Sequence, residues 1–312
     1  MAKHYIDKGI TLHAKYERLI KEITADDKIA IVNAGGGSKG SYQIGVNKKI
    51  HDSLPHPPHL YVGTSTGANN AVGMAFNGVN HTVDVWRNIK GRSDIFKEAS
   101  KWQIAANVLF GKELDGLNDP TPLYNMVLNN IQNRVLQTEA IITKVSMRDG
   151  SLHYVTASEA KSKEELAMNV VSSSAVPAHT NLVDYNWADG GVREITPLKK
   201  AIRFGCNVIF VVLTNPWVEN PIKEMDIAKL PKRLRLLKIV LRAIEILAHE
   251  VFLGDLRECI KCNSDPTKKK IRLCVFAPSQ PLHDSDEFDP SVLNDAIDKG
   301  LNETPIRIDG LD

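Results

Sequence analysis

Long apolar runs, a charge of one sign and an abundance of cysteine are all missing from this sequence. No uninterrupted apolar stretch approaches the ~18 residues that a membrane span requires, and the longest, Val208 to Leu213, has the length of a strand. The 312 residues carry a formal net charge of only +2, with 43% hydrophobic and 24% charged residues. This profile is typical of a globular protein, predicts no transmembrane segment and favours no nucleic-acid partner.

The chain has four cysteines and opens with Met-Ala-Lys-His rather than with an apolar segment. We therefore expect no secretory signal peptide, reduced thiols and a cytoplasmic location, although export by a signal-independent route would leave no trace here. Cys259 and Cys262 form a single C-x-x-C, and neither a second pair nor two closely spaced histidines follow it. A metal site of this type needs four ligands, so we predict no bound metal.

Strand and helix patterns alternate along most of the chain. A β-branched run at Ile29 to Asn33 leads through glycines into helical spacing at 41–54, and a short strand at 60–62 precedes a helix at 66–76. Helical spacing is also present at 5–25, and further strands are predicted at 140–147, 153–156, 207–213 and 271–276. This order predicts an α/β fold, a three-layer α/β/α sandwich with a mostly parallel central sheet.

The same pattern suggests three parts. Residues 1–27 are expected to form an N-terminal helical extension, 28–214 the core, and 215–312 a helical segment and last strand that pack on the same domain. The strongest helical periodicity, at 232–253, combines an apolar stripe with lysines and arginines. Such a helix either packs its stripe on the core, which we favour, or lies on an anionic membrane surface.

A glycine-rich turn follows the first predicted strand and opens a helix. Consecutive glycines let backbone N–H groups converge, and the helix N-terminus adds partial positive charge, so this turn is suited to hold an anion. The anion is either a pyrophosphate or the oxyanion of an acyl-transfer intermediate. The turn reads Gly35-Gly36-Gly37-Ser38-Lys39-Gly40.

A G-x-S-x-G motif, Gly63-Thr64-Ser65-Thr66-Gly67, stands at the second strand-to-helix junction. Glycines two residues on either side allow a sharp turn that lifts the serine hydroxyl above the sheet. The small residues that follow suit a helix packed closely against strands. This context predicts that Ser65 is a nucleophile.

The third motif is Asp189-Gly190-Gly191, which follows the turn-like stretch Asn186 to Ala188. An aspartate followed by two glycines can approach another backbone closely. A base that meets Ser65 without an intervening histidine needs this freedom.

Together these segments resemble the patatin-like phospholipases. IAIVNAGGGSKGSYQIGV at 29–46 is similar to the first strand, oxyanion loop and helix of that family, and YVGTSTGANNAVGMA at 61–75 is similar to its nucleophile elbow. Residues 172–177, SSSAVP, resemble the segment before the family's aspartate, and the stretch from Asp189 to Gly205 resembles that aspartate and the helix after it. The resemblance covers about residues 28–214.

The resemblance implies a lipid acyl hydrolase with a Ser65–Asp189 dyad, supported by Gly63, Gly67, Gly190 and Gly191, and with no metal or cofactor. Gly35 to Gly40 would form the oxyanion hole, in which N–H groups around Gly36, Gly37 and Ser38 would hold the oxyanion. The substrate would be a phospholipid, a lysophospholipid or another acyl lipid, and peripheral contact with a membrane fits such a substrate. Lys39 stands where the family more often has arginine, so the two-pronged geometry of a guanidinium is absent. The oligomeric state is left undetermined.

Four alternatives are open at this point. His249 and His283 follow Asp189 in the order of a Ser-Asp-His triad. The glycine turn could bind a dinucleotide, but the second strand runs into Gly63 and lacks the acidic residue that holds a ribose. An acyltransferase with a thioester donor could use the same elbow, although Thr64 occupies the position where a histidine would favour it. The last alternative is a non-catalytic lipid-binding protein.

Overall fold

The computed structural model describes residues 10–98, residues 116–217 except 178 and 185, isolated positions from 239 to 267, and residues 270–306. For residues 10–14 it describes the backbone alone. Cys259, Cys262 and most of the predicted helix at 232–253 lie outside the described residues. Among the described helices, none is both long and apolar enough to cross a bilayer.

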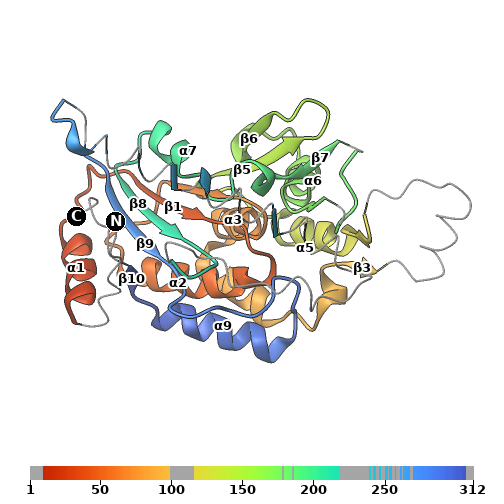
Figure 1. Ribbon diagram of the computed structural model, residues 1–312, viewed down its shortest axis with the longest axis horizontal. Coiled ribbons are helices and arrows are strands. Elements are labelled where there is room, and N and C mark those ends of the chain that lie inside the picture. The colour runs from red at the N-terminus through yellow and green to blue at the C-terminus, as the bar shows by residue number, and fades with distance from the viewer. Residues whose placement is uncertain are drawn as a thin grey trace, which may run out of the picture.

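The central sheet runs in the order β10-β9-β8-β1-β2-β5-β6, and β7 also pairs with β5 (Figure 1). The strands from β9 to β5 pair in parallel, whereas β10, β6 and β7 are antiparallel to their neighbours. The bounds are β1 Ile29–Asn33, β2 Leu60–Gly63, β5 Glu139–Ser146, β6 Leu152–Thr156, β7 Trp187–Asp189, β8 Val208–Val212, β9 Arg272–Phe276 and β10 Pro305–Ile306. The six strands predicted from the sequence are confirmed to within one residue at each end.

Both faces of the sheet are buried. Along β1, Ile29 and Ile31 contribute to one apolar core, and Ala30 and Val32 contribute to another. Side chains alternate between the two faces of a strand, so an uninterrupted apolar run is what a doubly covered parallel strand requires.

Helices cover these two faces (Figure 1). The first core receives residues of α2, α3, α5, α6 and α9, and the second receives Leu198 and Ala201 of α7. The bounds are α1 Ile10–Lys21, α2 Gly40–Ser53, α3 Thr66–Arg87, α5 Thr121–Ile131, α6 Lys163–Ser173, α7 Leu198–Arg203 and α9 Pro290–Asn302; a small second sheet pairs β3 Lys97–Glu98 with β4 Asn118–Asp119. The predicted α/β architecture with a mostly parallel sheet is confirmed.

Helices α2 and α9 run side by side beneath the sheet (Figure 1). Two glycines allow this contact, because a Cβ at Gly45 would lie 2.1 Å from the Ile297 carbonyl oxygen and one at Gly300 would lie 2.1 Å from the Tyr42 carbonyl oxygen. The C-terminal helix is thereby fixed to the helix that begins at the glycine-rich turn.

The stretch before Asp189 is a turn at Asn186, as predicted, but a strand at Trp187 and Ala188. Trp187–Asp189 forms β7, in which Ala188 pairs with Val145 of β5. Three residues are too few to show a periodicity. Their extended conformation comes from pairing with β5, which is distant in sequence, so the prediction of a turn was wrong for Trp187 and Ala188.

Candidate active site

Ser65 lies between the end of β2 and the first residue of α3. Its backbone has φ 57° and ψ −126°, a conformation that is strained for a residue with a side chain. The flanking glycines make the turn possible: a Cβ at Gly63 would lie 2.0 Å from the Gly67 carbonyl oxygen, and one at Gly67 would lie 2.3 Å from that of Asn33. The G-x-S-x-G motif therefore forms a tight elbow at the carboxyl end of the parallel strands.

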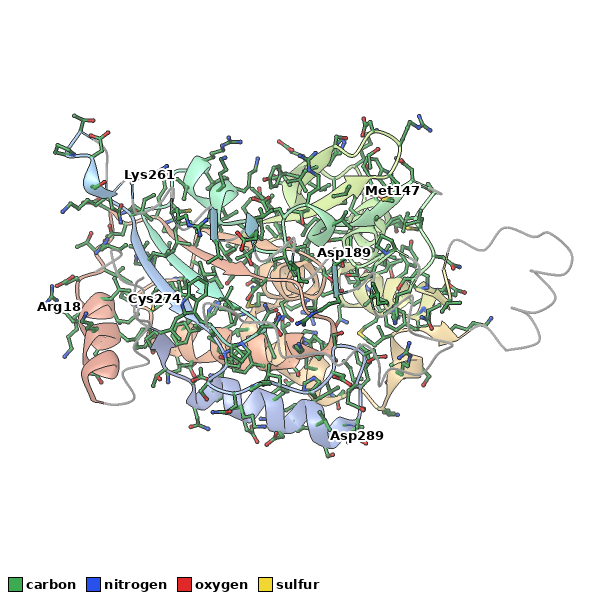
Figure 2. All side chains as sticks on the ribbon, in the orientation of Figure 1. Arg18, Met147, Asp189, Lys261, Cys274 and Asp289 are labelled. Carbon is green, nitrogen blue, oxygen red and sulfur yellow. The ribbon has the colours of Figure 1, made fainter. Side chains whose placement is uncertain are left out.

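Asp189 is the last residue of β7 and is 5% exposed. Its Oδ1 accepts a hydrogen bond of 2.7 Å from the Gly191 N–H. The neighbouring glycine is required sterically, because a Cβ at Gly190 would lie 2.0 Å from Oγ1 of the buried Thr143. Figure 2 shows Asp189 near the middle of the molecule.

The sheet topology brings Asp189 to the elbow. β5 pairs with β2 as far as Ile142, which is opposite Gly63, and then pairs on the same edge with β7, where Lys144 is opposite Asp189. The edge is the same one because β6 occupies the other side of β5. Asp189 therefore occupies the place along β5 that β2 vacates when the chain turns at Gly63.

The Ser65 side chain lies close enough to the Asp189 carboxylate to influence its pKa through hydrogen bonding. Burial raises the pKa of Asp189 from its ordinary value to about 6, and the hydrogen bonds from Ser65 and from the Gly191 N–H act in the opposite direction. A carboxylate of this kind is ionised at neutral pH and is a stronger base than an exposed aspartate.

Two residues of the glycine-rich turn have their N–H groups occupied by distant carbonyls. The Gly35 N–H donates to the Ile195 carbonyl oxygen at 2.9 Å, and the Ser38 N–H donates to that of Ser285 at 2.8 Å. In addition, the Ser38 hydroxyl donates to the Asp284 carbonyl oxygen at 3.1 Å. The expectation that the Ser38 N–H is available to an oxyanion does not agree with this conformation.

The remaining N–H groups of the turn fall into two sets, those with an acceptor inside the turn and those without an acceptor among the described residues. Those of Lys39 and Gly40 donate to carbonyl oxygens within the turn. Among the described residues, no acceptor is found for the N–H groups of Gly36 and Gly37, and both residues are partly exposed. Within the described part of the chain, the turn therefore leaves two backbone donors, at Gly36 and Gly37, that no protein acceptor occupies.

Lys39 extends from the turn to Asn215, and its Nζ donates to Asn215 Oδ1 at 2.7 Å. Next to this contact, the Thr214 hydroxyl donates to the Gly35 carbonyl oxygen at 2.7 Å. A Cβ at Gly36 would lie 2.5 Å from that hydroxyl oxygen. The segment after β8 therefore fits closely against the first half of the turn.

Of the two histidines of the triad alternative, the structure describes only His283, and this residue does not contribute to the pKa of Asp189. His283 lies beside the Ser38 backbone, in the segment that contacts the glycine-rich turn, and His249 lies outside the described residues. No histidine is among the groups that shift the pKa of Asp189. In the part of the chain that the structure describes, no three or more His, Cys, Asp and Glu side chains gather as they would around a metal ion.

A buried amide network that the sequence analysis missed holds both ends of the glycine-rich turn. Gln43 Nε2 donates to the Ala34 carbonyl oxygen at 2.8 Å, and Asn70 Nδ2 donates to that of Gly40 at 3.0 Å. Asn70 Oδ1 accepts from Trp86 Nε1 at 2.7 Å. The only sign of this network in the sequence was that Gln43 and Asn70 place amide side chains on helix faces that otherwise consist of apolar or small residues.

Comparison with known proteins places this geometry in a family. A family model described as "Patatin-like phospholipase" matches residues 31–202, which is more than half of the chain. This stretch includes Ser65, Asp189 and the glycine-rich turn. The chain belongs to the patatin-like phospholipase family. Membership assigns it, at the level of the family, to the lipid acyl hydrolases.

Two individual proteins are similar to this chain. "Uncharacterized protein YjjU" of Escherichia coli (strain K12) is 22% identical over 268 residues, which are 82% of this chain and 70% of that protein. The crystal structure of VipD from Legionella pneumophila aligns with a TM-score of 0.36 and 13% identity over 89% of this chain. The alignment spans 66% of the VipD chain, slightly less than two thirds of its length.

Proposed function

We propose that this patatin-like protein hydrolyses fatty-acyl esters of phospholipids or lysophospholipids through a Ser65–Asp189 dyad. The observation that carries the proposal is the placement of the buried Asp189 carboxylate at the Ser65 elbow, which follows from the pairing of β5 with β2 and then with β7. Hydrogen bonding from the Ser65 side chain lowers the pKa of this carboxylate, and no histidine contributes to it. The N–H groups of Gly36 and Gly37, which have no acceptor among the described residues, support it, since they offer donors for a developing negative charge.

In the proposed reaction, Ser65 Oγ attacks the carbonyl carbon of the acyl ester and its proton passes to the Asp189 carboxylate. The N–H groups of Gly36 and Gly37 bind the oxyanion of the tetrahedral intermediate. When the ester C–O bond breaks, the leaving alcohol takes the proton from Asp189, and the acyl group stays on Ser65. Water then attacks the acyl-enzyme with Asp189 as base, the fatty acid leaves, and Ser65 recovers its proton.

The direct test is product analysis on a panel of defined lipids: diacyl phospholipids with different head groups, the corresponding lysophospholipids, a triacylglycerol and an acyl thioester with an alcohol acceptor. We expect fatty acid from at least one phospholipid or lysophospholipid, at an unchanged rate in the presence of a chelator. The Ser65→Ala variant serves as the blank. Acyl transfer from the thioester without hydrolysis of any ester would instead identify an acyltransferase, and no turnover together with no labelling of Ser65 by a fluorophosphonate would favour a binding protein.

The pKa of Asp189 leads to a pH prediction. The base must be ionised to accept the Ser65 proton, and burial raises the pKa of Asp189 to about 6. We expect kcat/KM to be constant above neutral pH and to fall about tenfold per pH unit below the pKa. The measurement is the rate of hydrolysis of a soluble short-chain ester from pH 4.5 to 8.5, with circular dichroism to show that the protein stays folded. A rate that is flat down to pH 5 would exclude this carboxylate as the base.

A further inference from the structure

The end of α6 contacts the backbone of Ser65 directly through the N–H group and indirectly, by way of Asn69 of α3, at the carbonyl group. The Ser65 N–H donates to Ser173 Oγ at 2.9 Å. The Ser65 carbonyl oxygen accepts from Asn69 Nδ2 at 3.1 Å, and the same nitrogen contacts Ser174 Oγ at 3.0 Å. Consecutive serines on α6 and just after it therefore contact the elbow from one side.

The next residue of the same segment holds the other member of the dyad. The Asp189 N–H donates to the Ala175 carbonyl oxygen at 2.9 Å. Ser173 and Ala175 are both fully buried, so neither contact exchanges freely with water. Three consecutive residues thus bind the backbone of the nucleophile at one end and that of the base at the other.

The local geometry of Ser65 explains why an external acceptor is needed. With a positive φ directly before α3, the Ser65 N–H points away from the helix and has no intrahelical acceptor. A buried N–H without a partner is unfavourable, and the strained backbone persists only where surrounding contacts hold it. Ser173 Oγ supplies that contact.

The hydroxyl of Ser173 differs from those of its neighbours. Ser172 Oγ and Ser174 Oγ donate to the carbonyl oxygens of Met168 and Val170, one helical turn earlier. This is the usual behaviour of serine in a helix. Ser173 Oγ instead accepts from the elbow, across a contact between segments far apart in the sequence.

We infer that Ser173 to Ala175 form a positioning clamp, which fixes the Ser65 hydroxyl at hydrogen-bonding distance from the Asp189 carboxylate. The inference rests on the proposed function for its effect on turnover. Ser173 touches neither substrate nor reacting atoms and acts through the backbone of Ser65. Misplacement of a reacting group by about 1 Å is enough to reduce a rate by roughly 10²-fold.

The test compares Ser173→Ala with Ser172→Ala, which removes an equally buried hydroxyl from the same helix turn without contacting Ser65. For Ser173→Ala we expect kcat for a soluble ester to fall about 10- to 100-fold while KM changes less than about threefold. The acidic limb of the pH profile should move to higher pH, because a displaced Ser65 no longer hydrogen-bonds the Asp189 carboxylate. Ser172→Ala should change neither kcat nor the position of the acidic limb. Equal effects of the two variants would overturn the inference.

A second measurement is independent of turnover. Hydrogen exchange of peptides that cover residues 61–70 reports the Ser65 amide directly, and we expect it to speed up about tenfold or more in Ser173→Ala but not in Ser172→Ala. Unchanged exchange in Ser173→Ala would refute the clamp even if the enzyme proves to have another activity. If exchange responds but the wild-type protein neither hydrolyses esters nor reacts with a fluorophosphonate, the clamp stands and the proposed function fails.

Discussion

Replacement of Ser65 by alanine is expected to lower ester hydrolysis by about 10⁴-fold or more, because no other group in the proposed mechanism forms the acyl-enzyme. Asp189→Asn should also lower the rate of ester hydrolysis strongly. Asparagine keeps the shape of the side chain and can still accept from the Gly191 N–H, but it cannot take the Ser65 proton. The measurement is kcat/KM on the lipid that the product panel identifies.

Covalent labelling separates loss of chemistry from loss of folding. A fluorophosphonate should modify the wild-type protein at Ser65, as mapped by mass spectrometry of the labelled peptide, and should leave Ser65→Ala unmodified. Both variants should melt within a few degrees of the wild type, since neither substitution removes a large buried side chain. Turnover of either variant near the wild-type rate would remove that residue from the mechanism.

Gly37→Ala is expected to reduce kcat by about 10²- to 10³-fold, the loss that typically follows removal of one oxyanion donor. Gly37 has φ +60°, and a Cβ at this position would lie 2.0 Å from the Ser285 carbonyl oxygen. Because that oxygen belongs to the backbone and also accepts the Ser38 N–H, it cannot move without disturbing the turn. The turn must therefore shift, and the Gly36 and Gly37 N–H groups shift with it.

Gly205→Ala is the matched control. Gly205 also has a positive φ, +93°, but a Cβ at this position would meet no atom within 4 Å, and the residue is exposed. Both variants should lose about 1 kcal/mol of stability from the unfavourable backbone conformation, and Gly37→Ala should lose more because of its contact with the Ser285 carbonyl oxygen. Only Gly37→Ala should lose activity. Similar kinetics in the two variants would show that the glycine-rich turn does not bind the oxyanion.

The elements that the sequence predicted well are those with a local pattern. The run from Ile29 to Asn33, the glycines after it and the helix that follows are each visible within a few residues, and all three have the expected structure. The elbow at Ser65 was predictable for the same reason. Glycines at fixed offsets around a serine are a local signal of such a turn, although the contacts that hold it come from distant residues.

The features that the sequence could not predict depend on contacts between distant segments. β7 is a strand because Ala188 pairs with Val145, and nothing in Trp187 to Asp189 shows this. The Ser38 N–H is occupied by the Ser285 carbonyl oxygen, a contact that joins segments near the two ends of the chain. A carbonyl is the same in every residue, so no residue type could have indicated that acceptor.

This last contact bears on how the protein can be shortened. The stretch that matches the family ends at residue 202. The carbonyl oxygens that accept hydrogen bonds from Ser38 belong to residues 284 and 285, beyond that stretch. Strands β9 and β10 and helix α9 also lie beyond it. A fragment that ends at residue 202 would lack β8, so β1 would become an exposed edge of the sheet. It would also lack the carbonyl oxygens that bind Ser38 of the glycine-rich turn. The smallest useful fragment of this protein is therefore larger than its recognisable portion.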